Sequence, residues 1–153
     1  MSIVKTLRFP IAAEWWGGRT VDAEAPGKEG LRVVTPPEFR GGVAGEWSPE
    51  ELLVTAVASC YALTLAAVAE QANAPIHRVR LGGVGHVEGD RRGHYRFTVI
   101  ELEVELVTDP DAVEAAERAA ALAEEHCIVS RALDIPVHVR VAVRSAPLEE
   151  VLQ

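Results

Sequence analysis

The stretch that begins at Ser48 constrains the fold of this chain more than any other. Its opening Ser-Pro-Glu-Glu places Ser48 at a helix N-cap, Pro49 at the first helical position, and Glu51 where a capping box requires a carboxylate. The run that follows contains neither Gly nor another Pro until Pro75, where an Asn two residues earlier also favours an end. The sequence therefore predicts one long helix over residues 48–73.

This predicted helix is apolar on every side. Between Leu52 and Val68, the residues other than Cys60 that carry polar side chains are Thr55, Ser59, Tyr61 and Thr64. A helix of this composition is usually buried all round, and a small domain has too little surface to cover it alone. We therefore expect a long central helix that a second subunit helps to bury.

Short strands are expected on both sides of the helix. Residues 1–47 are rich in Gly and Pro, with brief apolar stretches at Ile3–Phe9, Thr20–Ala23 and Leu31–Thr35 and turns at Gly17-Gly18, Pro26-Gly27 and Gly41-Gly42. Residues 76–107 alternate apolar and charged side chains around a turn at Gly89–Gly93. This pattern predicts a hairpin with one face packed on the core and one face exposed to solvent.

The C-terminal part of the chain is expected to add a second helix and a last strand. Asp109-Pro110 predicts a helix cap, and a narrow apolar stripe within residues 109–133 turns Cys127 inward. Alternating valines predict a strand over residues 136–144. We expect residues 1–153 to form a single α+β domain, with mostly antiparallel sheets packed on the central helix.

Charge and hydropathy argue against several classes of partner. The formal net charge of −8 disfavours a phosphate-binding surface, so we expect no nucleic acid partner. No apolar run approaches the roughly 20 residues that cross a bilayer, and the N-terminus lacks the apolar core of a signal peptide. We therefore expect no membrane partner and a cytoplasmic location.

The two cysteines, Cys60 and Cys127, are the residues best suited to chemistry. In a reducing compartment such a sparse pair serves as buried packing, as a redox couple or as metal ligands. A metal site is disfavoured because His126 and Cys127, adjacent on a helix, face different directions and a fourth ligand is lacking. We expect neither a metal nor a cofactor.

A reactive Cys60 needs positive charge from another part of the chain. It lies about 18 Å beyond the helix cap, outside the reach of the helix N-terminal field, and burial alone would raise the pKa of its thiol. Arg19, in a Gly-Gly-Arg turn, is a candidate cation, although by itself it reads as a surface arginine. Glu50 lies about 15 Å along the helix from Cys60. Three roles are open to it: it stabilises the helix dipole, it orients Arg19, or it serves a site completed across a subunit interface.

Two segments resemble the OsmC/Ohr family of osmotically induced and organic hydroperoxide resistance proteins. Residues 47–60, WSPEELLVTAVASC, resemble the nucleophile helix of that family, and residues 123–133, AEEHCIVSRAL, resemble its resolving-cysteine segment. The order of elements also agrees over essentially the whole chain. Either motif alone would be a weak signal, but together they are specific.

The resemblance implies an OsmC-like fold, an intertwined homodimer and a thiol-dependent peroxidase of the oxidative stress response. The Cys60 thiolate would attack the O–O bond, an alcohol would leave, and Cys60 would become a sulfenic acid. Cys127 would resolve it to a Cys60–Cys127 disulfide, which an external dithiol must reduce. An apolar pocket would favour organic hydroperoxides over hydrogen peroxide. Its lining, or alternatively the core, would include the aromatic residues Trp15, Trp16, Phe39 and Trp47.

The resemblance also implies that Glu50 pairs with the arginine that activates Cys60. Arg19 is the best match for that arginine, and Arg40 and Arg32 are the alternatives, because residues 8–47 depart most from the family pattern. Two other readings stay open: a non-catalytic module of the same fold that binds a small apolar ligand, and a structural dimer with idle cysteines. A second cysteine at the resolving position favours the peroxidase.

Overall fold

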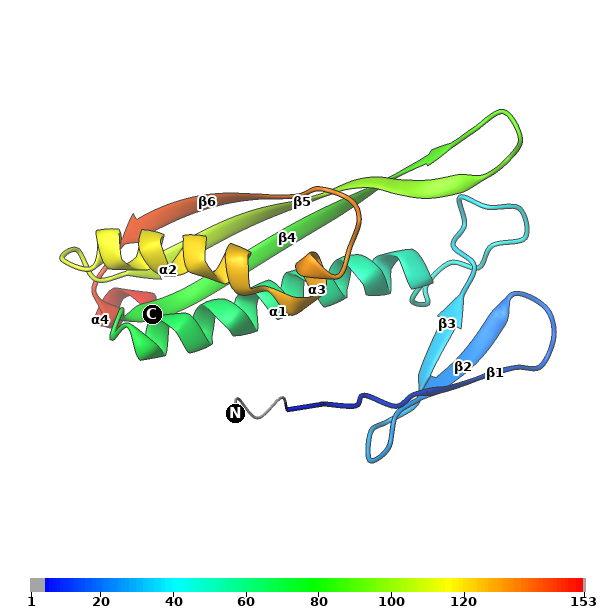
Figure 1. The fold of residues 1–153 in the computed structure, drawn as a ribbon, viewed down its shortest axis with the longest axis horizontal. Helices are drawn as coiled ribbons and strands as arrows, with labels where there is room; N and C mark the ends of the chain where they lie inside the picture. Colours follow the sequence, from blue (N-terminus) through cyan, green and yellow to red (C-terminus); the bar gives the residue numbers. More distant parts are fainter. Residues whose placement is uncertain (1–4, 153) are drawn as a thin grey trace. The chain divides into compact units, whose positions relative to one another are not determined.

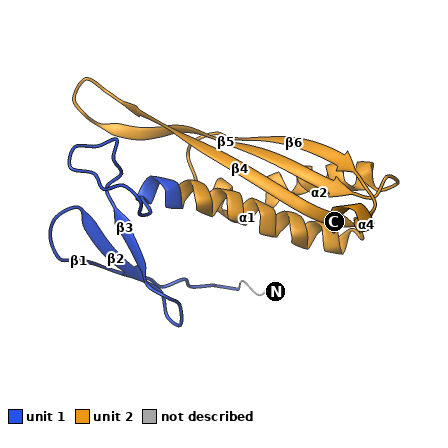
Figure 2. Cartoon of the chain, turned by 180° about the vertical axis from the view of Figure 1, so that it is seen from behind, with its two compact units in different colours: residues 1–52 blue, residues 53–153 orange. Residues whose placement is uncertain are grey.

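The computed structural model describes residues 5–152 of the chain (Figure 1). In chain order the elements are β1 (Ala12–Trp15), β2 (Thr20–Glu24), β3 (Leu31–Val34), α1 (Pro49–Gln71), β4 (Ile76–Gly89), β5 (Tyr95–Thr108), α2 (Val113–His126), α3 (Ile128–Arg131), β6 (Val137–Ser145) and α4 (Leu148–Val151). The chain divides into two compact units, residues 1–52 and residues 53–153 (Figure 2).

The first unit contains a three-stranded antiparallel sheet in the order β1-β2-β3. Its turns fall at the predicted glycines, since Gly17, Gly18 and Gly27 all have positive φ angles, which other residues adopt only with strain. The strand expected at residues 3–9 is not found, because residues 3 and 4 lie outside the described range and residues 5–9 form no strand. Strand β1 lies further along and was not predicted, since all four of its side chains are exposed and give no alternating pattern.

Helix α1 begins with the predicted capping box. The backbone N–H of Glu51 donates to Ser48 Oγ at 3.2 Å, and the backbone N–H of Ser48 donates to Glu51 Oε2 at 2.9 Å. These reciprocal bonds satisfy amides that have no carbonyl partner within the helix. Asn73, with a φ of 51°, ends the helix as expected.

The length of α1 corrects one expectation from the sequence. Its 23 residues include an 18-residue window of mean hydropathy 2.1, so by length and composition α1 is able to cross a membrane. The expectation that no apolar run approaches such a length is therefore wrong. Length and composition are weak evidence here, because the core helix of a soluble protein meets the same criterion. Val57, Tyr61, Leu65 and Ala69 of α1 are buried in the core of the described fold.

The second unit is built on a three-stranded sheet in the order β4-β5-β6. Strands β4 and β5 form the predicted antiparallel hairpin, whereas β6 runs parallel to β5 after the crossover through α2. In the middle of β5 alternate side chains are almost fully buried, namely Ile100, Leu102, Val104 and Leu106. They pack with residues of α1 and α2 in one core, while Glu103 and Glu105 on the opposite face are exposed. The α+β class and its mostly antiparallel pairing are confirmed.

The start of α2 differs from the prediction. Its N-cap is Ala112, which makes no side-chain capping bond, so the expected cap at Asp109-Pro110 is wrong. The Asp109 side chain is used elsewhere, because its Oδ1 lies 2.8 Å from Nε2 of the largely buried His77. The apolar stripe of α2 is as expected, and it buries Ala116, Ala120 and Ala123 on the side that leads to Cys127.

Candidate active site

The two cysteines lie together in the second unit. Cys60 is on the middle of α1 and is half-buried, whereas Cys127 is fully buried at the junction between α2 and α3. Both are free thiols, and Cys60 packs against the buried cluster that contains Cys127. Two cysteines that the sequence separates widely thus belong to one region of the core, and Cys127 is among the groups that lower the pKa of the Cys60 thiol.

Hydrogen bonds control the ionisation of Cys60. Burial raises the pKa of its thiol, but several hydrogen bonds together outweigh burial and lower that pKa below the ordinary value. Their donors are the backbone N–H of Val129, the side chains of Cys127 and Thr64, and the backbone N–H of Ile128. Hydrogen bonds that favour the charged form stabilise a thiolate, which is the nucleophilic form of cysteine.

The backbone donors are available because of where α3 begins. Ile128 and Val129 are the first two residues of this helix, so their N–H groups lack the carbonyl partner one turn earlier that later residues have. The carbonyl of Cys127 accepts the first bond of the helix, from the N–H of Arg131 at 3.1 Å. The turn that buries Cys127 therefore also directs two free amides at Cys60.

Cys127 has two hydroxyl-bearing residues close by. Ser130 Oγ donates a hydrogen bond to Cys127 Sγ at 3.2 Å. The Tyr61 ring is almost fully buried, and its hydroxyl donates to the carbonyl oxygen of Ala120 at 3.2 Å. Burial first, then the electrostatic effects of Glu124 and Cys127, raise the pKa of Tyr61 to about 12. Tyr61 is therefore a neutral hydrogen-bond donor at ordinary pH.

The carboxylate of Glu50, in the first unit, is incompletely satisfied. Its Oε2 is buried and has no hydrogen-bond partner among the described residues. Burying a carboxylate oxygen without a partner is costly, so this position suits a carboxylate that receives a cation or a donor during function. Glu50 and Arg19 form no ion pair in the structure.

Arg19 and its alternatives also belong to the first unit. The exposed Arg19 side chain passes over Gly41, because a Cβ at that glycine would lie only 3.3 Å from Arg19 Nε. Gly41 has a φ of +77°, so a glycine both permits this turn and leaves room for the guanidinium. Arg32 is engaged differently, since its Nε pairs with Asp22 Oδ1 at 3.5 Å. Arg40 is exposed.

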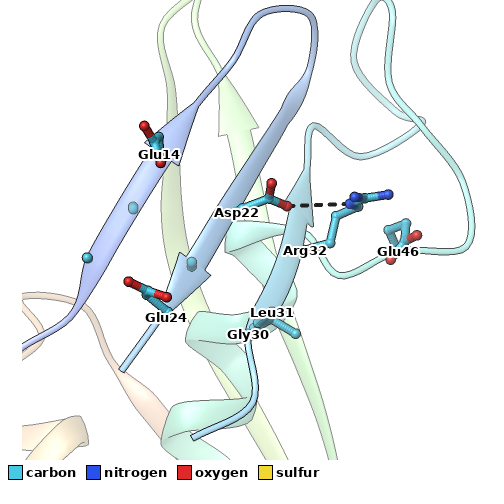
Figure 3. A pocket seen from close by; sticks show the side chains of 10 residues that line it. Glu14, Asp22, Glu24, Gly30, Leu31, Arg32 and Glu46 are labelled. Carbon is cyan, nitrogen blue, oxygen red and sulfur yellow. Dashed lines mark ion pairs between the residues drawn. The ribbon is translucent and has the colours of Figure 1, made fainter. Parts of the chain in front are cut away.

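A separate hollow of about 710 Å³ lies along the strands of the first unit (Figure 3). It is lined by the carboxylates Glu14, Asp22, Glu24 and Glu46 and by Arg32, the partner of Asp22. No nucleophile lines it. The hollow therefore does not coincide with the cysteine pair, and its chemistry differs from the apolar pocket expected from the sequence.

The tryptophans expected in a core or in a pocket are exposed in the structure. Trp15, Trp16 and Trp47 have 66%, 78% and 46% of their surface accessible. Trp15 Nε1 donates to the carbonyl of Gly18 at 3.1 Å, which closes the turn before Arg19. Among the described residues no cluster of three or more His, Cys, Asp or Glu could hold a metal ion.

Sequence reasoning missed four groups around the cysteines. It required a cation for Cys60 and overlooked the neutral donors, which are Thr64, the amides of Ile128 and Val129, and Ser130 beside Cys127. Thr64 was detectable, because a residue four positions after Cys60 lies on the same face of a helix. The amides of Ile128 and Val129 were not detectable, because the break between α2 and α3 at Cys127 has no Gly or Pro to mark it.

Comparisons with known proteins agree with this architecture. The sequence profile of the family described as OsmC-like protein matches residues 42–142. No curated protein matches the chain. An OsmC-like protein of unknown function from Vibrio cholerae has 18% identity and a TM-score of 0.79, covering 90% of this chain and 100% of its own.

Two other solved structures are similar and carry functional names. An organic hydroperoxide resistance protein OsmC from Legionella pneumophila has 22% identity and a TM-score of 0.72, with 92% of this chain and 98% of that one covered. An organic hydroperoxide resistance protein from Elizabethkingia anophelis has 18% identity and a TM-score of 0.73, with 94% and 100% covered. At these identities the likeness establishes the fold, and the matching profile establishes the family. The chain belongs to the OsmC-like protein family.

Proposed function

We propose that this protein is a thiol-dependent peroxidase that reduces organic hydroperoxides to alcohols. The observation that carries the proposal is the packing of Cys60 against the buried cluster that contains Cys127, together with the lowered pKa of the Cys60 thiol. A buried structural cysteine has no need of donors directed at its sulfur, whereas a nucleophile does. Relatives of this fold from Legionella pneumophila and Elizabethkingia anophelis are named organic hydroperoxide resistance proteins.

The proposed reaction uses the two thiols in turn. The Cys60 thiolate attacks one oxygen of the peroxide, the O–O bond breaks, and the other oxygen leaves as an alcohol after taking a proton. Cys60 is then a sulfenic acid, and Cys127 condenses with it to a disulfide with release of water. An external dithiol reduces the disulfide and is itself oxidised. The protein has no cofactor in this scheme.

Glu50 and Arg19 complete the proposed chemistry through the family resemblance. The resemblance assigns an arginine that stabilises the thiolate and a glutamate that holds the guanidinium, and Arg19 is the best match for that arginine. The unsatisfied Oε2 of Glu50 supports this assignment, because a guanidinium would supply the missing donors.

The state and location of the protein are part of the proposal. We propose a homodimer in the cytoplasm, with neither nucleic acid nor membrane as a partner. The dimer is supported by α1, since only 22% of its apolar window is buried within one chain and Leu63 is 73% exposed. A second copy that covered this apolar surface would remove it from water.

Thiol titration tests the proposed function directly. One equivalent of cumene hydroperoxide should remove both thiols of the reduced protein and release cumyl alcohol, while Cys60→Ser should consume no peroxide. Cys127→Ser should consume one equivalent and leave a sulfenic acid that dimedone traps. Unchanged thiols in the unsubstituted protein would contradict the peroxidase and favour a non-catalytic apolar-ligand module of the same fold. Loss of thiols without alcohol would likewise contradict it.

A further inference from the structure

Ser130 is positioned between the buried thiol of Cys127 and a cavity. Its Oγ lies 3.2 Å from Cys127 Sγ. The same residue lines a cavity of about 220 Å³, together with Tyr61, Glu124, Arg131, Val137 and Val139. This cavity is large enough for several water molecules, each of which occupies about 30 Å³ in the liquid.

Cys127 has no direct route to solvent for its proton. It is 0% exposed, and its sulfur has to change protonation state twice in each cycle if it resolves a sulfenic acid and is later released by a dithiol. The thiolate is the attacking form, so the thiol must lose a proton before the disulfide forms and must regain one after reduction. A buried group that gains and loses protons needs a neighbour that exchanges them with water.

The hydroxyl of Ser130 is suited to this task because it both donates and accepts hydrogen bonds. In the observed orientation it donates to the Cys127 sulfur, which stabilises a thiolate. After rotation about its C–O bond the same oxygen accepts from the thiol, while its own proton points elsewhere. Tyr61 cannot replace it, because the Tyr61 hydroxyl donates to the Ala120 carbonyl.

We propose that Ser130 is a catalytic residue that relays the proton between the Cys127 thiol and water in this cavity. This inference rests on the proposed peroxidase function and adds a residue to it. In the condensation step the Cys127 proton passes to Ser130 Oγ while the Ser130 hydroxyl proton passes to cavity water. The thiolate then attacks the Cys60 sulfur, the S–S bond forms, and the S–O bond breaks. The departing hydroxide takes a proton from solvent and leaves as water, so the protons balance.

Reduction uses the relay in the opposite direction. Cys60 is the more exposed of the two sulfurs, so a thiolate of the external dithiol attacks there and Cys127 departs as a thiolate. The Ser130 hydroxyl stabilises that leaving group and then transfers a proton from cavity water to it. The second thiol of the dithiol completes the exchange, which oxidises the dithiol and leaves both cysteines reduced.

Charged groups face the cavity from several elements and shape its pH dependence. Glu124 of α2 and Arg131 of α3 line it, and Tyr61 faces it from α1 with a pKa of about 12. The residues of β6 that line it, Val137 and Val139, are apolar. Variants of Ser130 leave all of these groups in place, so a changed pH profile reports on the hydroxyl itself.

Single-turnover kinetics of Ser130→Ala and Ser130→Thr test the relay. We expect Ser130→Ala to form the sulfenic acid at the unsubstituted rate but to form the disulfide at least tenfold more slowly, with a rate that rises with pH as hydroxide replaces the relay. Ser130→Thr, which keeps the hydroxyl, should restore most of the rate. Ser145→Ala, at an exposed serine at the end of β6, is the matched control. Unchanged disulfide formation in Ser130→Ala across the pH range would overturn the proposal.

A second measurement separates this inference from the proposed function. The disulfide is formed with diamide, without any peroxide, and its reduction by dithiothreitol is followed in the same variants. Slower reduction in Ser130→Ala, with rescue by Ser130→Thr, supports the relay even where cumene hydroperoxide leaves the thiols unchanged. Equal reduction rates in all variants, or no disulfide after diamide, would overturn it. Circular dichroism spectra that match the unsubstituted protein establish that each variant is folded.

Discussion

The Tyr61 hydroxyl donates a hydrogen bond to the Ala120 carbonyl at 3.2 Å. This bond links α1, which carries the proposed nucleophile, to α2, which leads to Cys127. The bond lies in the core, since Tyr61 is 1% and Ala120 is 3% exposed. It joins α1 and α2 one residue away from Cys60. The proximity of the two cysteines therefore depends on packing that neither cysteine makes.

Removing this hydroxyl should destabilise the fold and change its response to alkali. Tyr61→Phe should lower the free energy of unfolding by about 1 kcal/mol, the usual net value of a hydrogen bond. A pKa raised in the folded state, here from 10.0 to about 12, contributes stability that is fully present below pH 10 and is lost as the pH rises through about 12. Urea unfolding between pH 8 and pH 12 measures both effects. An alkaline loss of stability in Tyr61→Phe equal to that of the unsubstituted protein would contradict the assignment.

Hydrogen bonds to Cys60 should make it reactive at lower pH than an ordinary thiol. Its folded pKa is lowered, so the thiolate is the main form at a pH where a free cysteine is still protonated, and the associated stability is lost as the pH falls through the folded pKa. Thr64→Val removes one donor while keeping the side-chain shape, and it should raise the pH midpoint of Cys60 alkylation by iodoacetamide. Peptide mass mapping distinguishes Cys60 from the buried Cys127.

Thr55→Val provides the matched control for that experiment. Thr55 is exposed on the same helix and is not a donor to Cys60, so its loss should leave the midpoint unchanged. A midpoint for Thr64→Val equal to that of the control would show that the threonine hydroxyl does not help to ionise Cys60.

The site shows which features a sequence can predict and which it cannot. The capping box at Ser48, the hairpin and the inward position of Cys127 follow from local rules, and the structure contains all three. The parallel pairing of β6 with β5 does not follow from alternation, because a strand has the same alternating pattern in either direction. The amides of α3 were missed for a related reason, since backbone donors carry no residue-type signal.

A variant series identifies the arginine that serves Cys60. An opposite charge close to a thiolate lowers its pKa by about one unit or more, so Arg19→Ala should slow single-turnover sulfenic acid formation at pH 6 about tenfold, with recovery at higher pH. Arg32→Ala and Arg40→Ala should have little effect, because Arg32 already pairs with Asp22 and Arg40 is the weaker match. If Arg40→Ala forms the sulfenic acid slowly while Arg19→Ala forms it at the unsubstituted rate, then Arg40 is the arginine that serves Cys60.

Helix α1 approaches strand β4 closely because the strand carries glycines beneath it. A Cβ added at Gly85 would lie 2.6 Å from a ring carbon of Phe97 and 2.7 Å from a methyl group of Val54 on α1. Both distances are shorter than carbon atoms tolerate, so Gly85→Ala must displace the helix or the ring. Overpacking of this kind typically costs about 1–3 kcal/mol.

Gly82 provides the control for Gly85, since it lies in the same strand and a Cβ there would meet no atom within 4 Å. We expect urea unfolding to show a loss of about 1–3 kcal/mol for Gly85→Ala and almost none for Gly82→Ala. Because Val54 and Cys60 belong to one helix, a displaced α1 should also slow disulfide formation in Gly85→Ala. Equal stabilities for the two variants would mean that β4 does not limit the position of α1, and that the proximity of the two cysteines is set by α2 and α3 alone.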